Sequence, residues 1–115
     1  MIKTASVYDL KRDGGKNVLV TRLWPRGIRK RVISAWFKEL GPRYELLRNF
    51  KDGKIGWSGF RKAYLAGLKS PESRRAMDAL KVLAARKSIT LLCVCRDDKR
   101  CHRSLLRARI KLATR

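Results

Sequence analysis

Cysteine, histidine and arginine side chains gather in one short stretch, residues 89–106. It holds all three cysteines and the single histidine of the chain. A thiol near a helix start and several arginines has a lowered pKa and reacts as the thiolate, for which a neighbouring histidine is a general base. We therefore interpret Cys95, Cys101 and His102 as candidate catalytic residues. The alternative is that His102 packs at the helix start and holds the loop in shape.

The same stretch contains the residue types that bind zinc, in the pattern C-x-C-x5-C-H. Cys93 and Cys95 point to one face of a strand, but the adjacent Cys101 and His102 diverge at a helix start. We therefore predict no metal or other cofactor, and Cys/His metal binding stays an alternative function. Cys93 then packs as a small buried hydrophobe. An odd number of cysteines without a secretory context argues against a disulfide framework, although Cys95 and Cys101 can pair on oxidation.

Arginines and one tryptophan near this stretch and near residues 22–26 predict an anion pocket. Guanidinium groups bind phosphate or carboxylate through forked donors, helix-start amides add to this, and Trp24 stacks on a base or forms a wall. The alternative is that Trp24 belongs to the core and Arg22 pairs with Asp9 or Glu39. The predicted ligand-binding residues are Arg22, Trp24, Arg26, Arg96, Arg100 and Arg103.

The composition is strongly basic. Thirty Lys and Arg against nine Asp and Glu give a formal net charge of +21 at pH 7, a field that attracts polyanions. Nucleic acid or a nucleotide is the partner class that this favours, and the alternative is a basic surface adapted to the environment of the cell. Residues 1–115 suffice for one domain. Neither a membrane span nor a secretory signal is recognisable, so we expect a cytoplasmic protein that does not enter membranes. The sequence leaves the oligomeric state open.

The elements that must position these residues follow from apolar patterning. Strands are predicted within residues 2–8, 17–23 and 89–95, the last so apolar that both of its faces must be covered. Apolar residues at helical spacing predict helices over residues 33–40, 44–50 and 57–68. Ser70 and Pro71 mark the start of a fourth helix. A fifth, capped by Asp97 or Asp98, carries Leu105, Leu106, Ile110 and Ala113.

This order predicts a small α/β domain with a three-stranded mixed sheet flanked by about five helices. The turn around Asp13, Gly14 and Gly15 is short for a parallel crossover, so the first two strands are expected to be antiparallel if adjacent. The helical excursion between the second and third strands allows those two to be parallel. Their carboxyl ends then meet at one edge of the sheet, which brings the Trp24 segment opposite Cys95 and Cys101.

Several of these motifs resemble a known family. The runs VTRLWPRGI and WFKELGP, the W-x-x-F-x-x-x-Y-x-x-x-L helix and the late TLL strand are similar to YeaO-like proteins, a group within a larger family defined as a domain of unknown function. The strand ending in Cys93 and the run Cys101-His102-Arg103 resemble another branch of that family. The resemblance covers nearly the whole chain and implies the fold, but no activity. This chain departs from it at Thr21, usually Asp, and at Cys95, where an acidic residue is common nearby.

Overall fold

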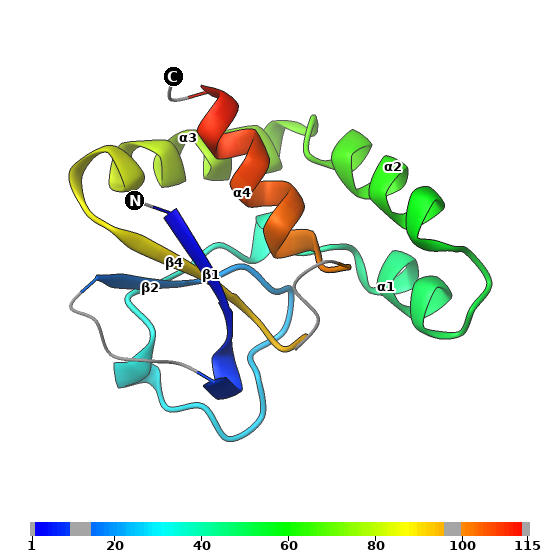
Figure 1. Cartoon of the computed structure of the whole chain (residues 1–115), viewed down its shortest axis with the longest axis horizontal. Helices are drawn as coiled ribbons and strands as arrows, with labels where there is room; N and C mark the ends of the chain where they lie inside the picture. The colour runs from blue at the N-terminus through cyan, green and yellow to red at the C-terminus, as the bar shows by residue number, and fades with distance from the viewer. Residues whose placement is uncertain (1, 10–14, 96–99, 114–115) are drawn as a thin grey trace.

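The computed structural model describes residues 2–9, 15–95 and 100–113 (Figure 1). The predicted turn residues Asp13 and Gly14 and the predicted caps Asp97 and Asp98 lie outside this part of the chain. The elements, with η for a short 3-10 helix, are β1 (Ile2–Ser6), η1 (Val7–Asp9), β2 (Lys16–Leu19), η2 (Lys30–Val32), β3 (Ala35–Trp36), η3 (Lys38–Leu40), α1 (Tyr44–Lys51), α2 (Trp57–Gly67), α3 (Pro71–Arg86), β4 (Ile89–Cys93) and α4 (His102–Ala113).

The sheet has four strands in the order β1-β4-β2-β3, and every neighbouring pair is parallel. β4 lies between β1 and β2, and all five of its residues are buried. Ile89 pairs with Ile2 on one side and with Lys16 on the other, so the three strands begin together and end at the same edge. The prediction that the second and third strands of the sequence are parallel is confirmed for β2 and β4. The class, α/β, is confirmed as well.

The prediction of a three-stranded mixed sheet was wrong. β1 and β2 are not neighbours, because β4 inserts between them and pairs in parallel with both. β1 has five residues and β2 four, so each spans only about 16 Å or less. By chain length alone, residues 7–15 are long enough to return the chain over that distance.

The prediction of a helix over residues 33–40 was also wrong, because this segment forms β3 and η3. Its backbone bonds to β2: the Ser34 amide donates to the Asn17 carbonyl at 2.8 Å, and the Phe37 amide donates to the Leu19 carbonyl at 2.9 Å. The segment is short and rich in β-branched and aromatic residues. Hydrogen bonds to the open edge of β2 therefore outweigh the helical spacing of its apolar residues. Trp36 is consequently 40% exposed rather than part of a core stripe.

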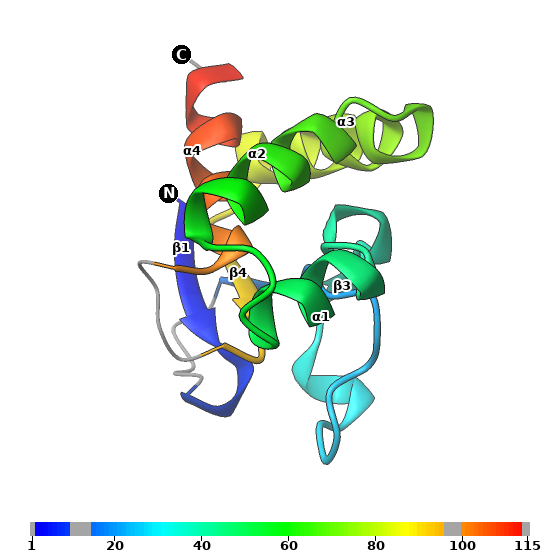
Figure 2. The same ribbon diagram turned by 90° about the vertical axis from the view of Figure 1, so that its right-hand side faces the viewer.

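The helices α2, α3 and α4 gather on one side of the sheet, and the long segment after β2 lies on the other (Figures 1 and 2). The main core fills the first side, where Phe60 and Tyr64 of α2 and Leu80 of α3 are buried, as predicted from their spacing. On the other side, Trp24 and neighbouring apolar residues pack over Leu19 and Leu92. Both faces of the central strands are therefore covered, so a ligand can reach these strands only at their ends.

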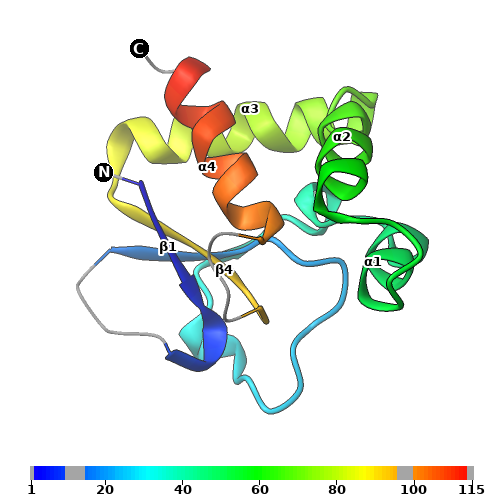
Figure 3. The same ribbon diagram turned by 45° about the vertical axis from the view of Figure 1, so that its right-hand side comes forward.

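The start of α3 was also predicted correctly. The Ser70 hydroxyl accepts a hydrogen bond from the Ser73 amide at 3.3 Å, and Pro71 is the first residue of α3. The orange end of α4 lies nearest the strands and its red end points away from them (Figure 3). In the described part of the chain, no helix is both long and apolar enough to cross a bilayer.

Candidate anion pocket and thiol cluster

A cavity of about 430 Å³ opens at the carboxyl edge of the sheet, where β2 and β4 end side by side. Its walls come from residues 21–26 after β2, residues 93–95 at the end of β4, part of α1 and its approach, and His102 at the start of α4. We refer to this cavity as the edge pocket. Its place matches the edge at which parallel α/β sheets usually bind their ligands.

The segment after β2 is held in shape by its own hydrogen bonds. Pro25 has no amide hydrogen to donate to a sheet ladder, which favours the end of the strand before it. The Trp24 Nε1 atom donates to the Ile28 carbonyl at 2.7 Å, which closes a tight loop. The Tyr8 hydroxyl donates to the Arg26 carbonyl at 3.1 Å and ties this loop to the end of η1. The wall that carries Arg26 is therefore anchored at both sides.

A close backbone contact fixes the other end of this wall. Arg22 Nε donates to the Gly41 carbonyl at 3.0 Å, and Trp36 Nε1 donates to the Thr21 carbonyl at 2.6 Å. An added Cβ on Gly41 would lie 2.6 Å from the Arg22 backbone nitrogen, so only glycine allows this approach. The alternative in which Arg22 pairs with Glu39 or Asp9 is thus replaced by a bond to a backbone carbonyl.

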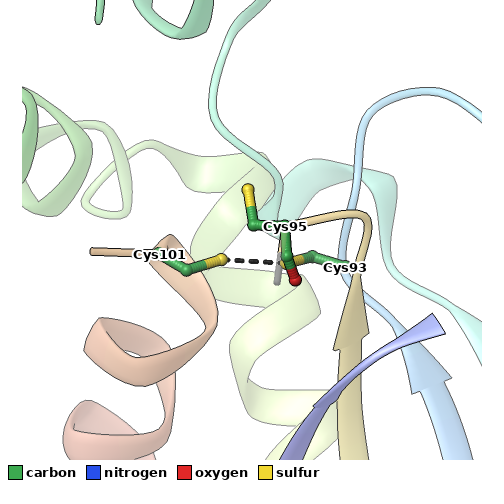
Figure 4. A group of neighbouring side chains, drawn as sticks. All are labelled: Cys93, Cys95 and Cys101. Atoms are coloured by element: carbon green, nitrogen blue, oxygen red, sulfur yellow. Dashed lines mark hydrogen bonds between the residues drawn. The ribbon is translucent and has the colours of Figure 1, made fainter. Parts of the chain in front are cut away.

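Three cysteines meet beside the edge pocket, and two of them, Cys93 and Cys95, line it. Cys93 ends β4, Cys101 immediately precedes α4, and Cys95 lies two residues beyond the strand. The Sγ atoms of Cys93 and Cys101 point at each other and lie 2.8 Å apart (Figure 4). All three Sγ atoms lie within 4.8 Å of one another. We refer to Cys93, Cys95 and Cys101 as the thiol cluster.

Arg103 connects the thiol cluster to the backbone beyond β4. Its guanidinium is 2% exposed, and Nη1 donates to Cys93 Sγ at 3.1 Å and also to the Cys95 carbonyl. A buried guanidinium is stable only with such acceptors around it. Arg103 therefore holds the strand end and the sulfur atoms in place and does not project into the edge pocket.

His102 is 4% exposed, and its ring packs edge-on against Tyr64 at 5.5 Å. Nε2 lies 2.6 Å from the Val20 carbonyl, which can only accept a hydrogen bond, so Nε2 carries the hydrogen of the neutral ring. Nδ1 then has a free lone pair and lies 3.7 Å from Cys101 Sγ. Burial lowers the pKa of His102 to about 4, so the ring is neutral at physiological pH.

The three thiols differ in acidity. Hydrogen bonds from Cys101 and Cys93 lower the pKa of Cys95, and the charge of Lys51 adds to this effect. The pKa of Cys101 is raised, because its hydrogen bonds with Cys93 and Cys95 favour the protonated thiol and because it is buried. The pKa of Cys93 is also raised. The hydrogen bond with Cys101 lowers this pKa, but the hydrogen bond with Cys95 and burial raise it by more. These shifts favour Cys95 as the place of a single negative charge in the cluster, and Cys95 is the more exposed of the two cysteines, Cys93 and Cys95, that line the edge pocket.

The structure brings most of the predicted site residues together. Arg22, Trp24, Arg26, Cys95 and His102 all line the edge pocket. Two segments that are far apart in the sequence therefore do converge at one edge of the sheet. Trp24 contributes to a wall while its other side packs on the core and meets the Trp36 ring edge-on at 5.4 Å.

The remaining predicted residues lie elsewhere. Cys101 and Arg103 are buried behind the edge pocket, and Arg100 is exposed without lining it. Arg96 lies outside the described residues. Sequence reasoning missed Lys51, which brings a third cation to the edge pocket from α1. The only available signal was its position at the end of a predicted helix, and that does not show which way the helix packs.

Comparisons with known proteins agree with the motifs described above. A family model described as "Active DUF488-N3 subclade" matches residues 2–114. The uncharacterised protein YeaO of Escherichia coli is 34% identical over 110 residues, which cover 91% of this chain and 92% of the relative. The uncharacterised protein Rv3073c of Mycobacterium tuberculosis is 31% identical over 108 residues, 91% of this chain and 89% of the relative. No solved structure matches the chain.

These matches span almost the whole sequence, including the W-P-R-G segment and the run Cys101-His102-Arg103. They confirm the resemblance that the motifs indicated. The names of the relatives carry no activity or ligand, so the family sets the fold and kinship of the chain but not its role. The chain belongs to the DUF488 family, within its YeaO-like group.

Proposed function

We propose that the edge pocket binds a phosphate-bearing anion, a nucleotide or a nucleic-acid segment. The observation that supports this is the lining of the cavity. Arg22, Arg26 and Lys51 line it from two different segments, and among its described lining residues none is acidic. Cations without neighbouring carboxylates attract an anion more strongly than cations already held in ion pairs.

The rest of the lining favours an anion with a planar apolar part over free phosphate. Trp24, Tyr44 and Leu47 supply aromatic and aliphatic surface next to the cations. The Trp24 N–H is already bonded to the Ile28 carbonyl, so the ring offers only its apolar surface to a ligand. Bases stack on such rings without sequence preference, and a cavity of about 430 Å³ falls in the usual range for small-ligand sites.

The whole chain is suited to the same class of ligand. A net charge of +21 raises the local concentration of any polyanion near the surface, whatever its sequence. Non-specific attraction must therefore be separated from binding in the edge pocket. A matched exposed arginine outside the pocket, Arg75 of α3, provides this control.

The test measures binding of AMP by calorimetry and of a short fluorescent single-stranded RNA by anisotropy, for the unchanged protein and three variants. Arg26→Ala and Lys51→Ala are each expected to weaken AMP binding about ten-fold, equivalent to about 1.4 kcal/mol. Each should also reduce the salt dependence of RNA binding by about one unit of log–log slope if it contacts a phosphate. Arg75→Ala should change AMP affinity less than two-fold on this scale. Equal losses in all three variants, or no AMP binding at low salt, would contradict the proposal.

A second candidate function is thiol chemistry at Cys95 on the bound ligand. Cys95 is the half-buried member of the thiol cluster and lines the edge pocket, whereas Cys93 and Cys101 are buried. Iodoacetamide should then alkylate Cys95 in the native protein, and AMP should slow the reaction. Reaction of all three thiols only on unfolding would rule this function out.

A further inference from the structure

The thiol cluster has a feature that an anion pocket does not need: three sulfur atoms converge from three separate backbone positions. Cys93 is at the end of β4, Cys95 follows it, and Cys101 comes from the turn before α4. Their Sγ atoms lie within 4.8 Å of one another, and two of them are buried (Figure 4). Cysteines that pack only as small hydrophobes have no reason to bring three sulfur atoms so close together, although only those of Cys93 and Cys101 point at each other (Figure 4).

The separations between the Sγ atoms of the thiol cluster lie on both sides of the value expected for two sulfur ligands in a tetrahedral zinc site. Zn–S bonds of about 2.3 Å place two sulfur ligands about 3.8 Å apart. The separations in the thiol cluster run from 2.8 Å, between Cys93 and Cys101, to less than 4.8 Å. The closest pair would move apart by about 1 Å on binding, which a side-chain rotation provides without moving the strand or the helix.

A nitrogen ligand lies next to the cluster in the correct tautomer. The Val20 carbonyl takes the Nε2 hydrogen of His102 at 2.6 Å, which leaves the Nδ1 lone pair free, 3.7 Å from Cys101 Sγ. Metal-ligating histidines almost always donate their other ring N–H to a carboxylate, a backbone carbonyl or a water molecule in this way. The bond to Val20 therefore fixes the tautomer that a zinc ligand needs, although Nδ1 is not among the ligand atoms that lie within 4.8 Å of one another.

The surrounding charge also fits. Three thiolates and one Zn²⁺ leave a net charge of −1, and the buried guanidinium of Arg103 lies 3.1 Å from Cys93 Sγ. An N–H donor to a thiolate ligand is a common second contact around structural zinc and offsets the remaining charge. The described residues around the sulfur atoms thus supply both the ligands and the counter-charge.

We propose that Cys93, Cys95 and Cys101 bind one Zn²⁺ that ties the end of β4 to the start of α4, and that His102 Nδ1, which lies beside Cys101 Sγ but outside the group of three sulfur atoms, becomes the fourth ligand when the ion draws the cluster together. Cys93, Cys95 and His102 also line the edge pocket, but the zinc proposal does not rest on the anion proposal because Arg22, Arg26 and Lys51 take no part in it. It is an alternative to thiol chemistry because the ion occupies Cys95. The donor set, three sulfurs and one imidazole nitrogen, is one that zinc uses in structural sites. Its spacing in the sequence is unusual because a strand end and a helix start supply the ligands in place of a zinc-finger loop.

The test uses the full chain, reduced, stripped with a chelator and titrated with Zn²⁺ alone. We expect one Zn²⁺ per chain after dialysis, a rise in the melting temperature, and protection of all three thiols from alkylation. Co²⁺ should give the near-ultraviolet absorbance of thiolate ligation. Cys95→Ser and Cys101→Ser should each lower Zn²⁺ affinity at least 100-fold, whereas Arg26→Ala, which lines the edge pocket, should leave it unchanged.

The unchanged protein keeps the proposal falsifiable if a cysteine variant does not fold. Less than half an equivalent of Zn²⁺ on the reduced chain would overturn the proposal, as would Zn²⁺ retained after N-ethylmaleimide has blocked every thiol. A third outcome is that the chelator-treated chain has only one reactive thiol before reduction and takes up no Zn²⁺ afterwards. This would identify Cys93 and Cys101 as a disulfide pair and would also overturn the proposal. Loss of AMP binding in Arg26→Ala with intact Zn²⁺ binding would show that the two sites are separate.

Discussion

Replacing Gly41 with alanine tests directly how the edge pocket is built. A Cβ at this position would lie 2.6 Å from the Arg22 backbone nitrogen and 2.8 Å from the Thr21 carbonyl carbon. Ordinary contacts of a Cβ atom begin at 3.4 Å, so η3 and the segment after β2 must move apart. The φ angle of Gly41 is −79°, which any residue adopts, so the cost is steric and not conformational.

The expected loss of stability follows from this overlap. Both partners are backbone atoms with no rotamer to change, and overpacking of this kind costs about 1–3 kcal/mol. For a domain of this size, each kcal/mol lowers the melting temperature by roughly 4–8 °C. Urea unfolding and thermal melts of Gly41→Ala measure the loss. Gly67→Ala at the end of α2 is the control, because a Cβ there meets nothing within 4 Å, and it should be neutral or stabilising by up to about 1 kcal/mol.

The same substitution should also weaken the edge pocket. Arg22 Nε donates to the Gly41 carbonyl, so a shift of either segment breaks the bond that orients this guanidinium. We expect AMP affinity to fall about three- to ten-fold in Gly41→Ala, equivalent to about 0.7–1.4 kcal/mol, and to be unchanged in Gly67→Ala. Equal stability and equal affinity of the two variants would refute the claim that the Gly41 contact positions the wall.

Two further predictions concern the buried ring groups beside the thiol cluster. The pKa of His102 falls from 6.5 in the unfolded chain to about 4 in the fold, so its contribution to stability is complete above pH 6.5 and is lost as the pH falls to 4. In the presence of a chelator, urea unfolding should show a loss of about 3 kcal/mol over that range, and His102→Gln should flatten it; an equal slope in the variant would contradict this. Tyr64→Phe removes a 2.6 Å hydrogen bond to the buried Leu40 carbonyl and should cost about 1–3 kcal/mol in the same assay. The exposed Tyr44→Phe should cost less than about 0.5 kcal/mol, and similar costs for the two would argue against the bond.

Local patterns in the sequence were enough to predict the elements that are marked by an apolar run, a helix cap or a regular apolar spacing. The apolar run that became β4, the Ser70 cap and the apolar spacing of α2 each depend on residues close together in the chain. The meeting of the Trp24 segment with Cys95 was also predictable, because the excursion between β2 and β4 allows parallel strands whose ends share an edge.

Features that depend on distant partners were not predictable in the same way. Residues 33–40 have helical spacing, and only the free edge of β2 makes β3 the better structure for them. The insertion of β4 between β1 and β2 depends on which strand pairs best with both, which no local pattern encodes. Lys51 reaches the edge pocket because of how α1 packs, and the direction in which Cys101 points depends on a turn that its spacing from His102 does not reveal.

The parallel arrangement of β2 and β4 is what makes a site possible in so small a domain. β4 is buried along its whole length, so none of its residues can meet a ligand before its last one, Cys93. If β2 were antiparallel to β4, the loop with Arg22 and Arg26 would emerge at the opposite edge, about 16 Å away, and no shared cavity would form. The wrong orientation predicted for β1 did not affect the prediction of the site, because β1 supplies no residue to the edge pocket. A ligand in the edge pocket must therefore depend on the parallel pair of β2 and β4 together with α1, which supplies Lys51, and a metal in the thiol cluster on the end of β4 and the start of α4.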